Sequence, residues 1–368
     1  YRMKRDRWES SSDEEEESEK VQEAVTTDPP AEKKARTEVT FPKHNPLTSG
    51  CRSVYDCYER LARIDEGTYG VVWRAKDLAT QEIVALKQIK FDDEMTKEGF
   101  PVTALREISV LLSLSHENVV SVREMCVGSS FDKVFMVMEF MEMDLKDALA
   151  KTGPSPLPQS ELKSMLHQIL SGTNHIHQKW LLHRDLKTSN ILVHRSGRIS
   201  LCDFGLARKY QHPLKALTQM VITLWYRPPE LLMGETVYGP EVDIWSIGCI
   251  FGELIIKDAI MQGQGELDQI DKIFKLVGIP TDESWPEFSK LPSSGIFRWK
   301  SLKGGSELAS KFPVNSPSGG QAFLDGNGFD LLTKLLTLNP KKRITAEQAL
   351  NHPYFKEGVE KQMPTFYF

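Results

Sequence analysis

Residues 182–190 read LHRDLKTSN, and residues 203–205 read DFG. We expect Asp185 to accept or orient a hydroxyl proton and Lys187 to steady a phosphate during its transfer. Asn190 and Asp203 carry oxygen atoms of the kind that Mg²⁺ prefers, so we expect both to bind this ion. Either motif alone is an ordinary polar loop or turn. Both together, in this order, indicate transfer of the γ-phosphate of ATP.

A glycine-rich stretch, EGTYGVV at residues 66–72, lies upstream between two strand-like stretches. Gly67 and Gly70 would let the backbone approach phosphate oxygens closely. Residues 84–87, VALK, then predict a short apolar strand that ends in Lys87. A single lysine on a strand is usually a solvated edge residue. The glycine-rich stretch before it favours a contact between Lys87 and the α- and β-phosphates of ATP.

The next predicted element is a helix over residues 102–116, with Pro101 suited to its first turn. Its apolar residues recur at helical spacing, at Leu105, Ile108, Leu111 and Leu112. Glu107 on this helix could be a solvated residue. The order of lysine, helix glutamate, catalytic loop and metal-binding aspartate favours instead an ion pair between Glu107 and Lys87.

Taken in order, these motifs resemble those of the eukaryotic protein kinases, and a narrower resemblance follows from residues 101–107, PVTALRE. This stretch is similar to the cyclin-contacting helix of the cyclin-dependent kinases. Four further stretches resemble the PITSLRE subfamily: CRSVY at 51–55, KEGF at 97–100, LKA at 214–216 and TLWYR at 223–227. The likeness covers residues 50–355.

The resemblance implies an α+β fold with two lobes. A kinase domain is expected over residues 58–355, with a β-rich N-lobe over about 58–138, a hinge at 139–143 and a mainly α-helical C-lobe over about 144–355. Residues 356–368 would form a C-terminal tail.

Two departures from the family pattern stand out. Asp65 replaces the first glycine of the glycine-rich loop, which is tolerable where φ stays negative and which also fits the subfamily. Val102 and Ala104 stand where the subfamily name would have isoleucine and serine. These changes are small in volume and bear on the choice of partner more than on catalysis.

The resemblance also implies an ATP site. Glu139 and Met141 would bind adenine through their backbones, Met138 would lie at the back of the site, and Asp144 would begin a helix and approach the ribose. Residues 135–138 also fit a plain core strand, and both interpretations can hold. The full expected set is Ile64, Gly67, Gly70, Val72, Ala85, Lys87, Glu107, Met138, Glu139, Met141, Asp144, Leu192 and Asp203.

The segment 203–230 is expected to carry regulation. Thr218 stands where related kinases are phosphorylated by an activating kinase, and a phosphate there could pair with three arginines from separate motifs. These are Arg106, Arg184 and Arg208. The alternative is a plain exposed threonine. Thr223 is expected to position Asp185, and Thr68 and Tyr69 match inhibitory phosphorylation sites of the wider family.

Two structural features are predicted for the C-lobe. Glu230 should form a buried ion pair with Arg343. Residues 161–180 show the apolar spacing of a long amphipathic helix, with Ser160 as its N-cap. Its histidines are expected to be structural or solvated, because kinase chemistry needs no imidazole; they are His167, His175 and His177.

Composition limits the other possibilities. The formal net charge of −5 gives no global basic field, so direct nucleic-acid binding is not evident. The five cysteines form no C-x-x-C pair, which argues against a disulfide framework or a zinc site and implies a reducing compartment. Cys202, next to Asp203, would line the ATP site. No stretch reaches the roughly 18 apolar residues that a membrane helix needs.

Residues 1–48 are polar and acidic and are expected to be a disordered tail. A solvated charge run is the simplest interpretation of residues 10–17, SSSDEEEE. The alternatives are phosphorylation of Ser10, Ser11 and Ser12 by an acid-directed kinase, and nuclear import through the basic residues 33–36. Because the chain begins at Tyr1, we expect it to be a fragment of a longer protein.

The expected function is that of a cyclin-dependent Ser/Thr kinase that uses ATP and Mg²⁺ and acts on Ser/Thr-Pro sites. The subfamily resemblance implies an L-type cyclin bound through the helix at 101–107, and an activating kinase. It also implies a nuclear location, with the cytoplasm as a further one, and roles in transcription, pre-mRNA splicing and the cell cycle. The alternative is a pseudokinase scaffold, which the intact catalytic set disfavours.

Overall fold

The computed structural model describes residues 50–67, 70–89, 102–130, 133–218, 221–295, 305–314 and 324–366. The predicted tail at 1–48, the stretch 97–101, Thr68 and Tyr69 lie outside the described residues. The chain forms two compact units, one of residues 1–99 with 122–140 and one of residues 100–121 with 141–368. The second unit includes the helix at 102–113, which we had expected in the N-lobe.

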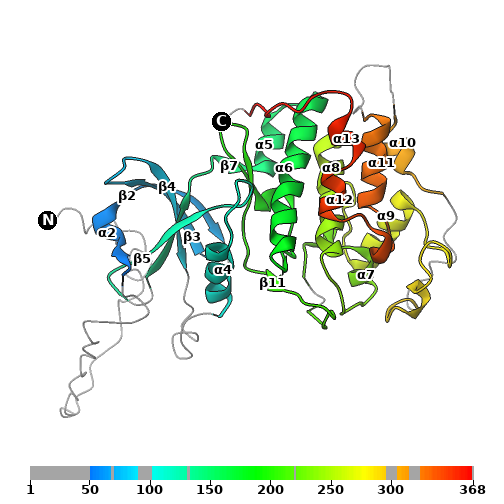
Figure 1. The fold of residues 1–368 in the computed structure, drawn as a ribbon, viewed down its shortest axis with the longest axis horizontal. Helices are drawn as coiled ribbons and strands as arrows, with labels where there is room; N and C mark the ends of the chain where they lie inside the picture. Colours follow the sequence, from blue (N-terminus) through cyan, green and yellow to red (C-terminus); the bar gives the residue numbers. More distant parts are fainter. Residues whose placement is uncertain are drawn as a thin grey trace, which may run out of the picture. The chain divides into compact units, whose positions relative to one another are not determined.

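The first unit is built on a six-stranded sheet with the order β1-β5-β6-β4-β3-β2 (Figure 1). Its strands are β1 (Arg52–Ser53), β2 (Tyr58–Gly67), β3 (Gly70–Asp77), β4 (Ile83–Ile89), β5 (Val122–Val127) and β6 (Val134–Glu139). Among the described strands of this sheet, only β1 and β5 pair in parallel, and a short helix, α2 (Val54–Cys57), joins β1 to β2. Successive hairpins therefore account for most of the sheet.

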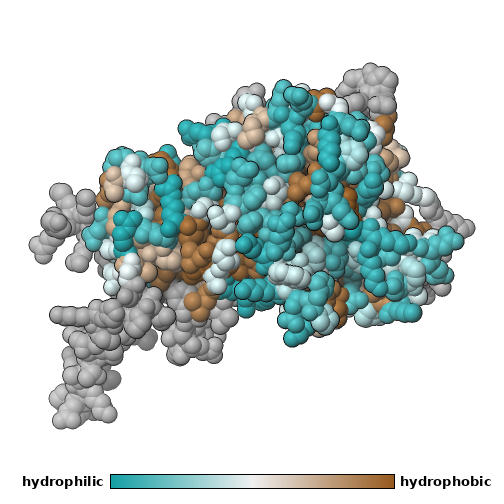
Figure 2. Space-filling model, in the orientation of Figure 1, coloured by the Kyte–Doolittle hydropathy of each residue, from teal (hydrophilic) through white to brown (hydrophobic). Residues whose placement is uncertain are grey.

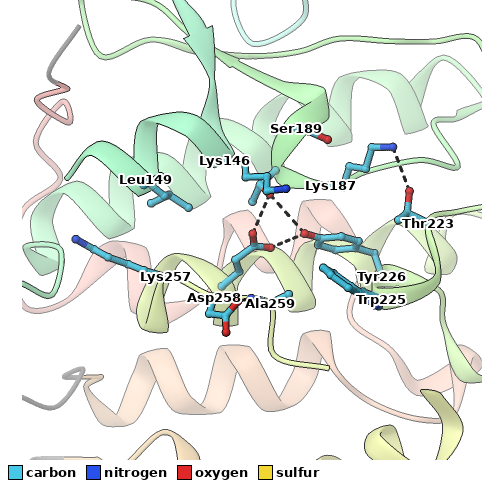
Figure 3. Close-up of a pocket in the computed structure, with 13 residues that line it drawn as sticks. Lys146, Leu149, Lys187, Ser189, Thr223, Trp225, Tyr226, Lys257, Asp258 and Ala259 are labelled. Carbon is cyan, nitrogen blue, oxygen red and sulfur yellow. Dashed lines mark hydrogen bonds between the residues drawn. The ribbon is translucent and has the colours of Figure 1, made fainter. Parts of the chain in front are cut away.

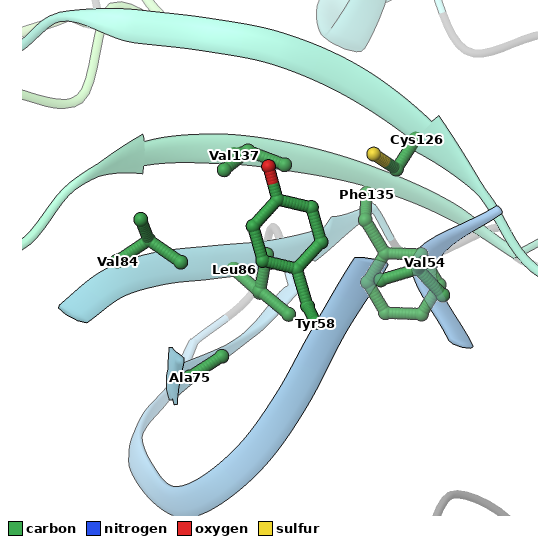
Figure 4. Packing of buried hydrophobic residues seen from close by; sticks show 8 residues of the cluster. All are labelled: Val54, Tyr58, Ala75, Val84, Leu86, Cys126, Phe135 and Val137. Carbon is green, nitrogen blue, oxygen red and sulfur yellow. The ribbon is translucent and has the colours of Figure 1, made fainter. Parts of the chain in front are cut away.

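Alternate residues of these strands fill the core of the first unit. Val84 and Leu86, two residues apart on β4, both point into the cluster that Figure 4 shows, together with Tyr58, Phe135 and Val137. Val54 of α2 is fully buried in the same cluster. Residues that precede the expected domain start at Tyr58 are thus part of the folded unit.

Polar contacts also attach β1 to the sheet. Arg52 Nε donates to Glu124 Oε2 at 3.0 Å, and the Tyr58 hydroxyl donates to Glu124 Oε1 at 2.5 Å. The pKa of Glu124 is lowered, chiefly by the hydrogen bond from Arg52. The ion pair of Arg52 and Glu124 therefore attaches β1 to β5, in addition to the backbone pairing of the two strands.

The second unit is mainly helical (Figure 1). Its α-helices are α4 (Val102–Ser113), α5 (Leu145–Lys151), α6 (Gln159–Gln178), α7 (Pro229–Leu232), α8 (Glu241–Ile256), α9 (Glu266–Val277), α10 (Leu308–Lys311), α11 (Gly326–Leu335), α12 (Ala346–Leu350) and α13 (Pro353–Lys356). Two small sheets, with the orders β10-β9-β7 and β11-β8, carry the loops between α5 and α7. Their strands are β7 (Met143–Asp144), β8 (Leu181–Leu182), β9 (Ile191–Val193), β10 (Ile199–Leu201) and β11 (Arg208–Lys209).

The helix α8 forms the centre of this unit. It packs against α6 and α11, and nearly all of its residues are buried, including Trp245 and Phe251. A helix that is apolar on every side must be covered on every side. The loops that follow β8 and precede α7 therefore rest on a rigid base.

The predicted helix over 161–180 is confirmed as α6, but its start was wrong. The helix begins at Gln159, its N-cap is Pro158, and no side chain caps it. Ser160 lies in the first turn, where its hydroxyl instead donates to Gln362 Oε1 at 3.4 Å. The predicted helix over 102–116 is shorter than expected and ends at Ser113.

The described part of the predicted C-terminal tail lies along α6. Lys163, which is buried in α6, donates through Nζ to the carbonyl of Glu357 at 2.7 Å, and Gln362 N donates to the carbonyl of Ser160 at 3.1 Å. Pro364 is buried as well. This segment is therefore part of the folded unit.

Among the described residues, none of the helices is both long enough and apolar enough to cross a membrane.

Candidate active site

Four predicted catalytic residues of the second unit meet at the Asp185 carboxylate. Lys187 Nζ and Asn190 Nδ2 each donate to Oδ2 at 2.9 Å. Thr223 donates to Oδ1 twice, from its hydroxyl at 2.9 Å and from its backbone N–H at 3.2 Å. Four donors from two distant segments thus hold this carboxylate in one orientation.

Lys187 joins the two segments directly. Its Nζ also donates to the Thr223 hydroxyl at 3.1 Å. Asn190 Nδ2 makes a further hydrogen bond of 2.8 Å to the Asp185 carbonyl. Asn190 therefore holds both the side chain and the backbone of Asp185. The loop itself turns through a short 3₁₀ helix, η1 (Thr188–Asn190).

The backbone of this loop is held by Asp243 of α8, a residue that the sequence analysis did not single out. Its Oδ2 accepts from His183 N, and its Oδ1 accepts from Arg184 N, both at 2.9 Å. His177 Nε2 lies 2.9 Å from Oδ2 as well. Burial by itself would raise the pKa of Asp243, but the hydrogen bond from His177 and the positive charges nearby lower it overall.

The contact with Arg184 N holds one of two residues of the site that have an unusual backbone conformation. Arg184 has φ = 66° and Asp203 has φ = 60°. Residues other than glycine seldom adopt this region of backbone conformation. Such conformations persist only where the surroundings impose them. A signal for Asp243 was present in the sequence, because it is an acidic residue next to a run of apolar residues in a predominantly apolar helix.

The predicted metal ligands both belong to the second unit. The side-chain nitrogen of Asn190 donates to Asp185, so its side-chain oxygen remains available for another partner. Asp203 Oδ1 accepts from Gly205 N at 3.4 Å. Mg²⁺ is commonly bound by one or two protein oxygens together with phosphate oxygens and water, so this donor set fits it. The described residues contain no group of three or more histidine, cysteine or acidic side chains arranged for a metal ion.

The expected ATP-binding residues divide between the two units. In the first unit, Ile64 lies on β2, Val72 on β3 is paired with Lys87 on β4, and Ala85 is paired with Met138 on β6. Gly70 begins β3 at φ = 153°; Gly67 ends β2 and Glu139 ends β6. Ile64, Val72 and Met138 thus lie on strands that the sequence predicted. Gly67, Gly70 and Glu139, which were expected in a loop and a hinge, stand instead at the ends of strands.

In the second unit, Asp144 caps α5 as predicted, since its carboxylate accepts from Asp147 N at 2.8 Å. Burial raises the pKa of Asp144. Met141 is buried, and Leu192 lies on β9. Glu107 is buried on α4, whereas Lys87 belongs to the other unit, so the ion pair between them stays a prediction.

Two of the predicted arginines, Arg106 and Arg184, lie within electrostatic reach of the third, Arg208. Burial lowers the pKa of Arg208, and the charges of Arg106 and Arg184 lower it further. Thr218 is exposed, and its carbonyl accepts from the Tyr238 hydroxyl at 2.6 Å. That hydroxyl in turn accepts from Arg184 at 2.9 Å. Tyr238, which the sequence analysis did not consider, therefore links the carbonyl of Thr218 to Arg184.

The predicted pair of Glu230 and Arg343 is confirmed. Its two hydrogen bonds measure 2.7 and 2.9 Å, and both side chains are almost fully buried. Arg343 also donates to the carbonyl of Glu241 at 2.8 Å, at the start of α8. The end of the segment 203–230, called the activation segment below, is thereby attached to α8.

A pocket of about 350 Å³ opens beside this network (Figure 3). It is lined by residues 187–189 and by Thr223, Trp225 and Tyr226, together with side chains of α5, the end of α8 and residues 257–259. At its base, Glu253 accepts from the Thr188 hydroxyl at 2.9 Å and from the Tyr226 hydroxyl at 2.7 Å. The pocket therefore adjoins the residues that hold Asp185.

Comparison with known proteins agrees with this geometry. The family model described as "Protein kinase domain" matches residues 58–355. The chain belongs to the protein kinase family. Within this family, a kinase of similar length is "Cyclin-dependent kinase 11" of Dictyostelium discoideum, which is 48% identical over 316 residues, 86% of this chain and 84% of that protein.

Two further comparisons narrow the place of this kinase in the family. "Cyclin-dependent kinase G-1" of Oryza sativa subsp. indica is 49% identical over 324 residues, which are 87% of this chain and 46% of that protein. The solved structure titled "Crystal Structure of the yeast RNA Pol II CTD kinase CTDK-1 complex" has a chain with a TM-score of 0.74 and 37% identity. The match covers 83% of this kinase and 95% of that chain.

The predicted fold class and the resemblance to PITSLRE-type cyclin-dependent kinases are thus confirmed. This kinase spans less than half the length of the first curated relatives that it matches. The hydrogen bonds of the structure, and not these comparisons, show which site residues contact one another.

Proposed function

We propose that this chain is a cyclin-dependent protein serine/threonine kinase that transfers the γ-phosphate of ATP to a serine or threonine followed by proline. The observation that carries the proposal is the fully supported carboxylate of Asp185, which accepts hydrogen bonds from Lys187, Asn190 and Thr223. A scaffold without catalysis has no need to maintain four donors on one carboxylate.

The proposed reaction is a single transfer. The Asp185 carboxylate accepts the proton of the substrate hydroxyl as the hydroxyl oxygen bonds to the γ-phosphorus. The bond from that phosphorus to the bridging oxygen breaks, and ADP leaves. Lys187 stabilises the negative charge on the transferred group. Mg²⁺, when bound at Asn190 and Asp203, neutralises charge on the phosphates of ATP.

We further propose that a cyclin binds through α4, with an L-type cyclin as the candidate that the subfamily resemblance implies. Leu105 and Leu112 on this helix are 49% and 58% exposed, and Figure 2 shows hydrophobic surface over α4. Exposed apolar side chains of this size on one helix are typical of a protein interface. The relatives are themselves named cyclin-dependent. A nuclear location and roles in transcription, splicing and the cell cycle are part of the same proposal.

The test is transfer of phosphate from Mg-ATP to a Ser-Pro peptide, measured by mass spectrometry. The purified chain is assayed alone, with an L-type cyclin, and as Asp185→Asn. An Ala-Pro peptide is the control for the acceptor. Transfer that requires both the cyclin and Asp185 supports the proposal. Absence of transfer, with the cyclin bound and Thr218 phosphorylated, would instead assign the chain to the pseudokinase scaffolds.

A further inference from the structure

The pocket beside the catalytic network contains a cationic side chain that the proposed reaction does not use. Lys146 lies in the first turn of α5, and its ammonium is drawn over the centre of the pocket in Figure 3. Among the described residues, this ammonium group makes no hydrogen bond or ion pair. The Ser189 hydroxyl, also on the pocket wall, makes none within the same part of the chain. The pocket therefore offers unused donors.

The acidic groups of the pocket are already engaged. Both oxygens of Glu253 accept hydrogen bonds from hydroxyl groups, of Thr188 and Tyr226. Burial raises the pKa of Glu253, whereas those two hydrogen bonds and the charge of Lys146 act in the opposite direction. Asp258 accepts from Ala259 N at 2.9 Å and from Gln262 Nε2 at 2.8 Å. Both contacts of Asp258 go to Oδ1, and Figure 3 shows its carboxylate turned away from Lys146.

A second lysine reinforces the positive charge. Lys257 donates through Nζ to the Thr152 hydroxyl and to the carbonyl of Gly153, both at 2.8 Å, so it has neutral partners only. Burial lowers the pKa of Lys257. In Figure 3 this side chain points outward from the pocket, whereas Lys187 is turned toward Thr223. Lys146 is thus the cation best placed to meet a group inside the pocket.

We propose that this pocket binds an anionic side chain of the protein substrate, a carboxylate or a phosphate, on one side of the phosphorylated residue, with Lys146 and Ser189 as its donors. The inference rests on the proposed function, because Lys187 and Thr223 join the pocket to the site where the acceptor hydroxyl would lie. It adds a selection for substrates that carry an acidic or previously phosphorylated residue near the Ser/Thr-Pro site.

The experiment compares Ser-Pro peptides in which one neighbouring position at a time carries glutamine, glutamate, phosphoserine or arginine. The expected result is a higher kcat/KM for glutamate than for glutamine, by about fivefold, at adjacent positions on one side of the acceptor. Phosphoserine should give a larger ratio, because it carries a charge of about −2. The ratio should fall as the salt concentration rises from about 50 to 500 mM.

Substitutions of Lys146 test whether this side chain causes the preference for acidic peptides. Lys146→Ala should reduce the glutamate-to-glutamine ratio to about one, and Lys146→Glu should reverse it, because each removes or inverts the cation. Lys151→Ala, on the same helix but outside the pocket, is the matched control and should keep the ratio. Both Lys146 substitutions suit the first turn of an exposed helix, so the fold should be retained.

The outcomes are distinct from those for the proposed function. Transfer to the glutamine peptide with no gain for acidic peptides would overturn the inference and leave the kinase assignment in place. A preference for arginine would overturn it too and would assign the pocket to Glu253. If no peptide is phosphorylated, binding of fluorescent peptides with alanine at the acceptor position decides the inference by anisotropy. Equal affinity for acidic and neutral peptides there would also overturn it.

Discussion

Thr223 holds the Asp185 carboxylate through two hydrogen bonds to the same oxygen, one from its hydroxyl at 2.9 Å and one from its backbone N–H at 3.2 Å. The two residues are far apart in the chain, and the contact forms only when the activation segment returns to the catalytic loop. A contact of this kind links the order of that segment to the geometry of the proposed base.

Thr223→Val should therefore lower kcat while leaving the KM for ATP nearly unchanged. A hydrogen bond to a charged group contributes about 1.5–3 kcal/mol, which corresponds to roughly tenfold to a hundredfold in rate. Thr223→Ser keeps the hydroxyl and should retain most of the activity. Steady-state kinetics with a Ser-Pro peptide test this, and equal rates for the valine and serine variants would contradict the positioning role.

Asp243→Asn should destabilise the second unit and lower kcat together. The change removes the charge that faces His177 and turns one acceptor toward backbone N–H groups into a donor. Breaking a buried charged contact on one side costs about 3–5 kcal/mol. Urea denaturation measures the stability. An unfolding free energy equal to that of the unchanged protein would refute the support that we assign to Asp243.

The same residue predicts a dependence on pH. The pKa of Asp243 is lower in the folded chain than its ordinary value of about 3.9. Its contribution to stability is therefore complete above that value and is lost as the pH falls through the folded pKa. Thermal unfolding followed from neutral pH down to about pH 3 should lose less stability in Asp243→Asn than in the unchanged protein. Parallel curves would speak against this linkage.

Disruption of the pair of Glu230 and Arg343 should be costly for the fold. Glu230→Gln leaves a buried guanidinium without its charge partner, and the expected loss is about 3–5 kcal/mol. The matched control is the exposed pair of Asp268 and Lys272, where Asp268→Asn should cost far less, because solvent screens the charges. Denaturant midpoints for both variants provide the measurement, and similar losses would show that burial is not the deciding factor.

Thr218→Ala should lower the activity of the cyclin complex without removing ATP binding. A phosphate at Thr218 would bring a charge of about −2 toward the cluster of Arg106, Arg184 and Arg208. Kinase assays before and after treatment with an activating kinase test this. The unchanged protein should gain activity on treatment, whereas the alanine variant should not. Equal activity of the two treated proteins would mean that another contact orders the segment.

Much of this protein can be predicted from short stretches of sequence. The motifs at 182–190 and 203–205 were sufficient to predict the reaction class. The spacing within the first motif reflects contacts inside a single loop, such as that of Asn190 with Asp185. Apolar periodicity predicted α6, and the capping position of Asp144 was also correct. The start of α6 was missed, because Gln159 and Pro158 carry no capping side chain to mark it.

Only the tertiary structure decided which distant side chains support the site. Asp243 lies about sixty positions from the backbone N–H groups that it accepts from, and nothing in local propensity relates them. The same holds for Tyr238 with Thr218 and for Lys146 in its pocket. Local sequence determined the chemical groups and the elements that carry them, because helices, strands and loop motifs depend on neighbouring residues. The packing of α8 beneath the loops decided their geometry, because burial and hydrogen bonding act between segments that the chain separates.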